Sequence, residues 1–278
     1  MRHRLLRAIC IALLPLLLSA CWQDAPPVES SLLPQEEEPS DTGSLSLPEQ
    51  FSLAYAPGES LDPITCADGM QQVVASLLCE GLFRLGPDFE PEPWLCKSYT
   101  YDPVSYTYVF TLYHGITFSD GSFLTSADVK ATLDRARSSE RYGARLSDVT
   151  GITAGSETVT VTLAGPNTGF PALLDIPIVK DGTWERPVGT GPYLFSAEDS
   201  GDWLIANQSW WRGAKQPLDR IALVEASDQD TLLYRFSSHD VQLMTADLTG
   251  TTPISATDNV TYLDAGTTVL QYLGCNTT

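Results

Sequence analysis

The sequence has 278 residues, of which 43% are hydrophobic and 18% are charged. A chain of this length and composition forms one large or two ordinary domains, which excludes a largely unfolded protein. Its formal net charge is −19 at pH 7. Such a surface repels nucleic acid and other polyanions over most of its area, so we expect no nucleic-acid partner.

Residues 1–20 have the layout of an export signal. Positive side chains precede an apolar run over residues 8–18 that is too short for a permanent transmembrane helix. The run ends in Leu-Ser-Ala-Cys, which resembles the lipobox of bacterial lipoproteins, where cleavage before the cysteine leaves Cys21 acylated. Two or three acyl chains hold a protein stably on a membrane. An ordinary secretory signal with an incidental cysteine is the alternative.

The segment after the signal, residues 21–50, is expected to be a lipidated cysteine followed by a tether. Residues 22–49 contain seven acidic side chains, five prolines and no Lys or Arg. Self-repelling charge and frequent proline favour an extended, unfolded chain. We interpret it as a spacer that holds a folded body at the outer face of the bacterial cytoplasmic membrane, in the periplasm or at the cell surface. A merely tolerated acidic tail is the alternative.

The remaining cysteines are expected in an export compartment, where disulfides can persist. They are Cys66, Cys79, Cys96 and Cys275. Four cysteines allow three connectivities. The first pair to test is Cys79 with Cys96, because both lie in one local unit, and buried free thiols explain the pattern at least as well.

The folded body is expected to begin at Phe51. Residues 51–55 alternate apolar with small or polar side chains, which predicts a strand. Residues 71–83 place apolar side chains at helical spacing, which predicts a helix that stops near Gly81 and Gly86.

The middle of the body is expected to combine a helix with antiparallel strands. Residues 106–112 and 158–163 have the alternation of half-buried strands. Between them Thr125 is a candidate N-cap, and Asp128 is placed to meet free backbone N–H groups of the first helical turn.

The last elements are strands over residues 203–206 and 220–224 and a helix over residues 230–236. Helices and strands alternate irregularly and show no repeat. An α/β or mixed α+β body of more than one subdomain fits this order better than a single barrel or sandwich.

Six short motifs then occur in a particular order. They are Ser60-Leu61-Asp62-Pro63, Glu80-Gly81-Leu82-Phe83, Glu92-Pro93-Trp94-Leu95, the run from Phe118 to Val129, Gly189-Thr190-Gly191-Pro192-Tyr193 and Trp210-Trp211-Arg212-Gly213. Together they resemble the family 5 type of solute-binding lipoproteins of bacterial oligopeptide, dipeptide and nickel ABC importers. The resemblance runs from about residue 51 to the last residue.

The resemblance implies a periplasmic-binding-protein-like II fold with two lobes. Lobe I would comprise residues 51–66 and 176–266, with an inserted domain over residues 67–175. Residues 267–278 would begin the crossover to a second lobe. Family members are substantially longer, so we expect that lobe to be missing from this sequence, either because it is a fragment or because the gene is truncated.

The resemblance also implies a function. The lobes would close on an oligopeptide, and the closed form would dock on the permease subunits of an ABC transporter. We expect a monomer held to the membrane through the lipid on Cys21, with no cofactor, no bound metal and no catalytic residues.

Candidate ligand-binding residues follow from the same resemblance. Cys66, Ala67, Asp68 and Gly69 match a segment that lines the cleft in peptide-binding members, where Asp68 could lie near a ligand cation. The alternative for Asp68 is an N-cap of the next helix. Tyr142 matches an aromatic residue that reaches toward the ligand in some members, and a surface tyrosine is an equal alternative.

Other motif residues are interpreted as structural. Gly189, Gly191 and Tyr193 are expected in a tight turn, with the glycines allowing positive φ. Trp210 and Trp211 are expected to pack in a core rather than to stack on sugars.

Several functions remain open beside oligopeptide capture. Nickel-binding and haem-binding relatives share these motifs, so such ligands are alternatives. A non-transport lipoprotein, either a peptide-signal receptor or a truncated remnant that binds nothing, is another. An extracytoplasmic hydrolase is the least favoured, because neither His114 nor His239 belongs to a recognisable nucleophile or zinc motif.

Overall fold

The structure is a computed structural model that describes residues 50–245 and 260–261. The expected export signal, Cys21 and the tether up to residue 49 lie outside the described residues. So do Cys275 and the expected crossover over residues 267–278.

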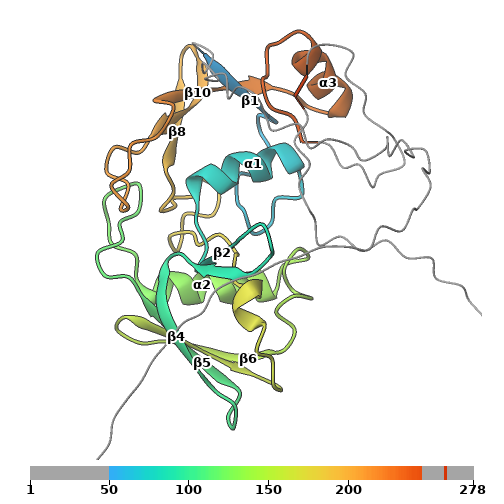
Figure 1. Cartoon of the computed structure of the whole chain (residues 1–278). Coiled ribbons are helices and arrows are strands. Elements are labelled where there is room, and N and C mark those ends of the chain that lie inside the picture. Colours follow the sequence, from blue (N-terminus) through green and yellow to red (C-terminus); the bar gives the residue numbers. More distant parts are fainter. Residues whose placement is uncertain (1–49, 246–259, 262–278) are drawn as a thin grey trace, which may run out of the picture. The chain divides into compact units, whose positions relative to one another are not determined.

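A four-stranded sheet, called here the first sheet, has the strand order β1-β10-β9-β8 (Figure 1). Its strands are β1 (Phe51–Tyr55), β8 (Tyr193–Glu198), β9 (Gly201–Ala206) and β10 (Arg220–Glu225). β1 pairs with β10 in parallel, and the other pairs are antiparallel. The first strand of the body therefore lies against a strand from near the end of the described chain.

Two helices cover opposite faces of the first sheet. Leu53 and Tyr55 of β1 share a core with α1 (Gly69–Leu78). Ala54, which points to the other face, packs with Leu232 of α3 (Gln229–Ser237). Successive side chains of a strand point to opposite faces, so a strand buried on both sides is apolar throughout. This explains the run of small and apolar residues in β1.

Helix α1 ends five residues earlier than the helical spacing of residues 71–83 predicts. Cys79, its C-cap, is already extended, with φ −129° and ψ 141°. At Gly81 the backbone passes so close to another segment that a Cβ would lie 2.9 Å from the Asp175 carbonyl carbon. Leu82 and Phe83 then enter a different core from α1. The prediction was wrong here because periodicity cannot show that a chain leaves one core for another.

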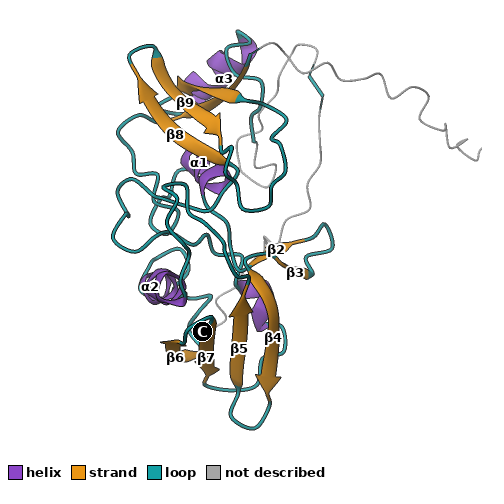
Figure 2. Ribbon diagram, turned by 90° about the vertical axis from the view of Figure 1, so that its left-hand side faces the viewer, coloured by secondary structure: helices purple, strands orange, loops and turns teal. Residues whose placement is uncertain are grey.

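The second sheet has the order β4-β5-β7-β6 and is antiparallel throughout (Figure 2). Its strands are β4 (Cys96–Asp102), β5 (Thr107–Leu112), β6 (Val149–Ala154) and β7 (Thr158–Leu163). Tyr108, Phe110, Val159 and Val161 fill its inner face, while the alternate threonines lie on the half-exposed outer face. This is the alternation predicted for β5 and β7.

Helix α2 (Ser126–Arg137) packs against β6 and β7. The Thr125 Oγ1 accepts a hydrogen bond from the Asp128 N–H at 3.3 Å, and the Asp128 carboxylate accepts from the Thr125 N–H at 3.0 Å. The predicted capping of this helix is confirmed as a reciprocal capping box.

Short elements complete the described body. They are β2 (Phe83–Leu85), β3 (Pro91–Pro93) and the 3₁₀ helix η1 (Phe170–Leu173). β2 and β3 form a two-stranded ribbon. The side chain of Asp228 caps α3 by accepting from the Thr231 N–H at 2.7 Å.

The two sheets have separate hydrophobic cores, in agreement with the mixed α/β fold class expected from the sequence. The division into lobe I and an inserted domain over residues 67–175 stays a prediction. Val74 and Leu78 of α1 lie in the core of the first sheet, so we propose to draw the start of the inserted domain after α1 rather than at Ala67.

Cys66, Cys79 and Cys96 are buried free thiols. Cys79 lies in the core of the first sheet and Cys96 in the core of the second. The two cysteines considered first for a disulfide are therefore in different cores. Burial raises the pKa of the Cys96 thiol to about 11 and raises the pKa of Cys79 as well. Such thiols are chemically inert.

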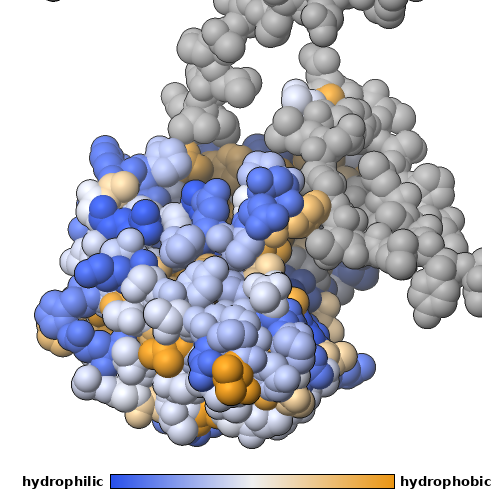
Figure 3. Space-filling model, turned by 60° about the horizontal axis from the view of Figure 1, so that its bottom comes forward, coloured by the Kyte–Doolittle hydropathy of each residue, from blue (hydrophilic) through white to orange (hydrophobic). Residues whose placement is uncertain are grey.

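Figure 3 shows the face of the molecule that lies at the bottom of Figure 1. Hydrophilic and intermediate side chains cover most of it, and the apolar ones form separate spots. Scattered apolar side chains are normal on a soluble surface. Among the described side chains that this view shows, the apolar ones do not join into one continuous area.

Candidate ligand-binding site and the buried junction beside it

Glu80 lies just after α1, and only 8% of the residue is exposed. Its carboxylate accepts four hydrogen bonds from uncharged donors. The donors are Trp94 Nε1 at 2.8 Å, Trp210 Nε1 at 3.2 Å, Trp211 Nε1 at 2.7 Å and Thr190 Oγ1 at 2.8 Å. We call these five residues the Glu80 junction. A buried carboxylate is tolerated when its lone pairs are satisfied in this way.

The Glu80 junction explains why several of the sequence motifs occur together. Glu80, Trp94, Thr190 and the Trp210–Trp211 pair each come from a different motif. Trp94 and Trp211 also pack against the core of the second sheet. The expected core packing of the two adjacent tryptophans is therefore confirmed for Trp211, and both indoles have the further role of hydrogen-bond donors.

The sequence analysis expected Gly189 and Gly191 to be needed for positive φ. In the structure they are needed because other atoms pack too closely for a Cβ. A Cβ on Gly189 would lie 2.1 Å from the Leu78 carbonyl oxygen, and one on Gly191 would lie 2.5 Å from the Leu77 carbonyl oxygen. The Gly191 N–H donates to the Leu78 carbonyl at 2.9 Å. The turn thus closes on the last residues of α1, and neither glycine has a positive φ.

The predicted loop at residues 66–69 leads directly into α1. The Asp68 Oδ1 accepts hydrogen bonds from the Met70 N–H at 2.9 Å and the Gln71 N–H at 3.0 Å. Asp68 is therefore the N-cap of α1, which confirms the structural alternative for this side chain. Cys66 is buried, whereas Ala67 and Gly69 are exposed.

The carbonyl groups of this loop are held by two side chains. The Cys66 carbonyl accepts from Arg141 Nη1 at 3.2 Å and from Gln72 Nε2 at 3.3 Å. Gln72 Nε2 also reaches the Ala67 carbonyl at 3.3 Å. Within the described part of the chain, the backbone N–H groups of Ala67 and Asp68 have no acceptor. The loop is therefore fixed in place while it still offers backbone donors.

Tyr142 belongs to the core of the second sheet, with 5% of the residue exposed. The guanidinium carbons of Arg141 and Arg145 lie 5.2 Å and 5.8 Å from the centre of its ring. These distances are within the range of cation–π attraction. The tyrosine is thus neither a surface residue nor an extended arm, but it positions two arginines.

One of the two predicted segments, that of Tyr142, lines a cavity, which we call the Arg141 cavity. It has a volume of about 270 Å³ and is lined by Pro63, Gln72, Ala75, Ser76, Arg141, Tyr142, Arg145, Asp175 and Pro177. Tyr142 and Arg141 line it, whereas residues 66–69 do not and are linked to its wall by the Arg141 hydrogen bond to the Cys66 carbonyl. Neither Arg141 nor Arg145 was singled out from the sequence, since no motif contains them.

The charges of the Arg141 cavity are unequal. Arg145 forms an ion pair with Asp175 and donates to the Ala172 carbonyl at 3.2 Å. Burial lowers the pKa of Arg145, although a guanidinium stays protonated in proteins. Arg141 is exposed and forms no ion pair with any residue that the structure describes. The cavity therefore carries an excess positive charge in an acidic protein.

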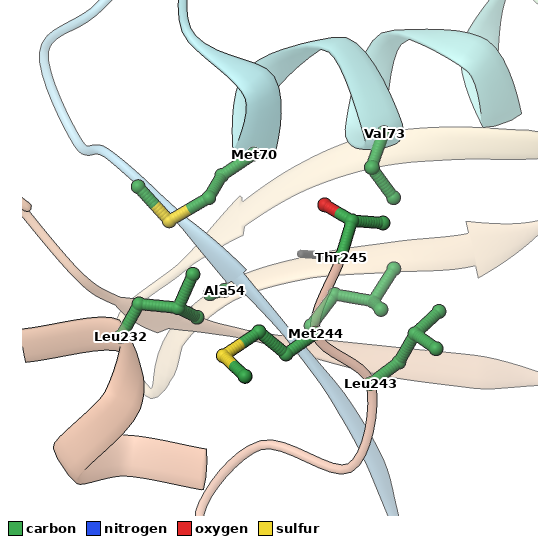
Figure 4. A pocket seen from close by; sticks show the side chains of 8 residues that line it. Ala54, Met70, Val73, Leu232, Leu243, Met244 and Thr245 are labelled. Atoms are coloured by element: carbon green, nitrogen blue, oxygen red, sulfur yellow. The ribbon is translucent and has the colours of Figure 1, made fainter. Parts of the chain in front are cut away.

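Two other hollows differ from the Arg141 cavity in chemistry. Figure 4 shows a small one of about 20 Å³, where Met70 and Val73 of α1 face Leu232 and Met244. It is apolar and too small for a solute. A larger groove of about 600 Å³ follows β8 and residues 186–189, but none of the predicted site residues lines it.

Among residues 50–245 and 260–261, no helix is long and apolar enough to cross a membrane. In the same part of the chain, no three His, Cys, Asp or Glu side chains lie together as a metal site.

Residues 90–278 match the model of the bacterial extracellular solute-binding proteins, family 5 Middle. The chain belongs to this family. It is 30% identical over 189 residues to the glutathione-binding protein GsiB of Salmonella choleraesuis, a match that covers 62% of this chain. The chain spans only 37% of the length of that relative.

Solved structures show the same fold. One is the periplasmic binding protein AgaA of Agrobacterium tumefaciens R10 with agropinic acid, at 27% identity and a TM-score of 0.58. Another is NikZ of Campylobacter jejuni with Ni(L-His), at 20% identity and a TM-score of 0.57. The matches cover 69% and 70% of this chain and 42% and 43% of those chains.

Proposed function

We propose that this chain is part of a membrane-anchored extracytoplasmic receptor that captures oligopeptides and delivers them to the permease of an ABC importer. The observation that carries the proposal is that Arg141, which lines the Arg141 cavity beside Tyr142, donates a hydrogen bond from Nη1 to the Cys66 carbonyl of the other candidate segment. Family membership supports the receptor class.

The chemistry of the site suits a peptide. A buried peptide N–H or C=O without a partner costs about 1–3 kcal/mol, so a binding surface must supply backbone or side-chain partners. The loop supplies the N–H groups of Ala67 and Asp68, and the cavity adds the polar side chains of Gln72 and Ser76. The relative named for glutathione, which is a tripeptide, supports the same ligand class.

Thermal melting of the full-length chain with a pool of di- to hexapeptides tests the proposal. A ligand that binds the native state raises Tm by mass action. We expect a concentration-dependent rise in Tm and, by mass spectrometry, a pool that stays intact. Loss of peptides with formation of fragments would instead indicate a hydrolase.

A metal chelate is the second candidate ligand, because NikZ was solved with Ni(L-His). The same melting experiment with nickel and histidine separates the two candidates. A rise in Tm with the chelate and none with the peptide pool would overturn oligopeptide capture in favour of a nickel-type receptor.

Lipid anchoring is a separate part of the proposal and has its own test. We expect the natural chain to incorporate labelled palmitate and to sediment with membranes, whereas Cys21→Ser should do neither. A labelled Cys21→Ser variant would contradict anchoring at this residue.

A further inference from the structure

We infer that Arg141 binds a carboxylate group of the captured solute. The inference rests on the proposed function, because it assigns one chemical group of the ligand to one side chain of the Arg141 cavity. It also narrows the solute class to molecules that keep a free carboxylate, such as peptides with an unblocked C-terminus.

The first reason is that the Arg141 side chain is held in place while some of its N–H donors have no acceptor among the described residues. Its Nη1 donates to the Cys66 carbonyl at 3.2 Å, and its guanidinium carbon lies 5.2 Å from the Tyr142 ring. A guanidinium has several further N–H donors arranged in a planar fork. Within the described part of the chain, no other acceptor takes them. The side chain is thus oriented before a ligand arrives, which reduces the entropy lost on binding.

The second reason is the contrast with the neighbouring arginine. Arg145 and Asp175 compensate each other by an ion pair. Arg141 has no such partner among the residues described, so it supplies the uncompensated positive charge of the cavity. The chain as a whole has a net charge of −19, so the charge of this cavity is opposite in sign to that of the whole chain.

The third reason is the cost of covering Arg141 with a neutral solute. A charged group removed from water without a partner destabilises a complex by several kcal/mol. A carboxylate removes that cost, because two parallel N–H···O bonds match the guanidinium fork. A solute that fills the cavity is therefore selected for a carboxylate at this position.

Calorimetry with tri-alanine, glutathione and tri-alanine amide tests the inference. For the natural chain we expect amidation of tri-alanine to weaken binding by about 10- to 100-fold, as for the loss of a charged hydrogen-bonded pair. Arg141→Gln should weaken tri-alanine binding by a similar factor and should bind the free acid and the amide alike. The affinity of Arg141→Lys for tri-alanine should lie between those of the natural chain and Arg141→Gln, since an ammonium keeps the charge but not the planar pair of donors.

The matched control is Arg186→Gln, which removes one exposed arginine outside the Arg141 cavity. It should leave the affinity for tri-alanine within about twofold, and melting of each variant without ligand checks that it folds. Competition with acetate and with inorganic phosphate distinguishes a carboxylate site from a phosphate site. If phosphate displaces tri-alanine and acetate does not, the carboxylate assignment is overturned.

Failure of the inference and failure of the proposed function give different results. If the natural chain binds tri-alanine and Arg141→Gln keeps both the affinity and the preference for the free acid, Arg141 is not the carboxylate site and peptide capture stands. If the natural chain binds neither the three peptides nor the wider peptide pool, both are overturned.

Discussion

The Glu80 junction and the Arg141 cavity are both built around a charged side chain, and they treat its charge in opposite ways. Glu80 is buried, and uncharged donors satisfy its carboxylate. Arg141 is exposed, and one backbone carbonyl takes only part of its donor capacity. The first arrangement is closed to further partners, whereas the second is open to one.

We interpret the Glu80 junction as serving the stability of the fold and Arg141 as serving the recognition of a solute. The residues of the Glu80 junction lie in the motifs that carry the family resemblance, and their contacts are internal to the fold. Arg141 and Arg145 lie in no motif. Within a family whose members bind unlike solutes, residues that hold the fold are expected to be shared, and residues that select the solute are expected to differ.

The largest loss in the free energy of unfolding is expected from Gly189→Ala, which introduces a Cβ into the close packing around the Glu80 junction. The new Cβ would lie 2.1 Å from the Leu78 carbonyl oxygen and 2.6 Å from the Cys79 Sγ. Overpacking against backbone should lower the free energy of unfolding by about 3 kcal/mol or more. Urea unfolding measures it. Gly165→Ala is the control, because no atom lies within 4 Å of its Cβ position, and equal losses in both variants would contradict the packing argument.

The next effect is expected from Glu80→Gln, which keeps the shape of the side chain. One carboxylate oxygen becomes an NH₂ group that faces indole N–H or hydroxyl donors, so buried donors lose their acceptor. We expect a loss of about 2–3 kcal/mol in the free energy of unfolding. Glu92→Gln breaks only the exposed ion pair with Arg84 and should cost less than about 1 kcal/mol. If the two variants unfold at the same urea concentration, the Glu80 junction is not a stabilising centre.

A smaller effect is expected at the wall of the Arg141 cavity. Arg145 and Asp175 have side chains that are 27% and 31% exposed, so Arg145→Gln should cost about 1–2 kcal/mol. A double-mutant cycle with Asp175→Asn should give a coupling of about 0.5–1 kcal/mol. Arg141→Gln should change the unfolding free energy by less than about 0.5 kcal/mol. A large loss for Arg141→Gln would show that this arginine serves the fold.

The smallest effect on the free energy of unfolding is expected from the protonation of Asp120. The neighbouring residue, Ser119, donates a backbone hydrogen bond to the Gly189 carbonyl. Hydrogen bonds from Lys180 and Ser122 hold the pKa of Asp120 at about 2. An aspartate in an unfolded chain has a pKa of about 3.9. The contribution is therefore present above about pH 4 and is lost as the pH falls toward 2.

Asp120→Asn measures this contribution. Its side chain is 39% exposed, so solvent screening limits the loss at pH 6 to less than about 1 kcal/mol. The variant and the natural chain should converge near pH 2 in urea titrations. A difference that grows as the pH falls would contradict the sign of the shift.

Much of the local structure could be predicted from the sequence. The capping box of Thr125 and Asp128, the N-cap at Asp68 and the alternation of β5 and β7 depend on neighbours within a few residues. Of the residues predicted for the site, Tyr142 lines the Arg141 cavity and Cys66 accepts a hydrogen bond from Arg141, and their part in ligand binding stays a prediction.

What could not be predicted depends on contacts between distant segments. Helix α1 ends at Leu78, and the chain then passes close to Asp175 at Gly81, while the need for Gly189 comes from the carbonyl of Leu78. Arg141 was missed because a single arginine in a polar stretch carries no periodic or motif signal. Its importance comes from the Cys66 carbonyl, 75 residues away in the chain.

The sequence by itself determined the family, the mixed α/β class and the local caps, because these follow from short-range patterns and from the order of motifs. Only the tertiary structure decided which charges are satisfied and which are open. Donors from three other motifs satisfy the Glu80 carboxylate, while Arg141 keeps N–H donors without an acceptor among the described residues. Satisfaction of a polar group depends on partners brought together by folding, and linear spacing does not encode them.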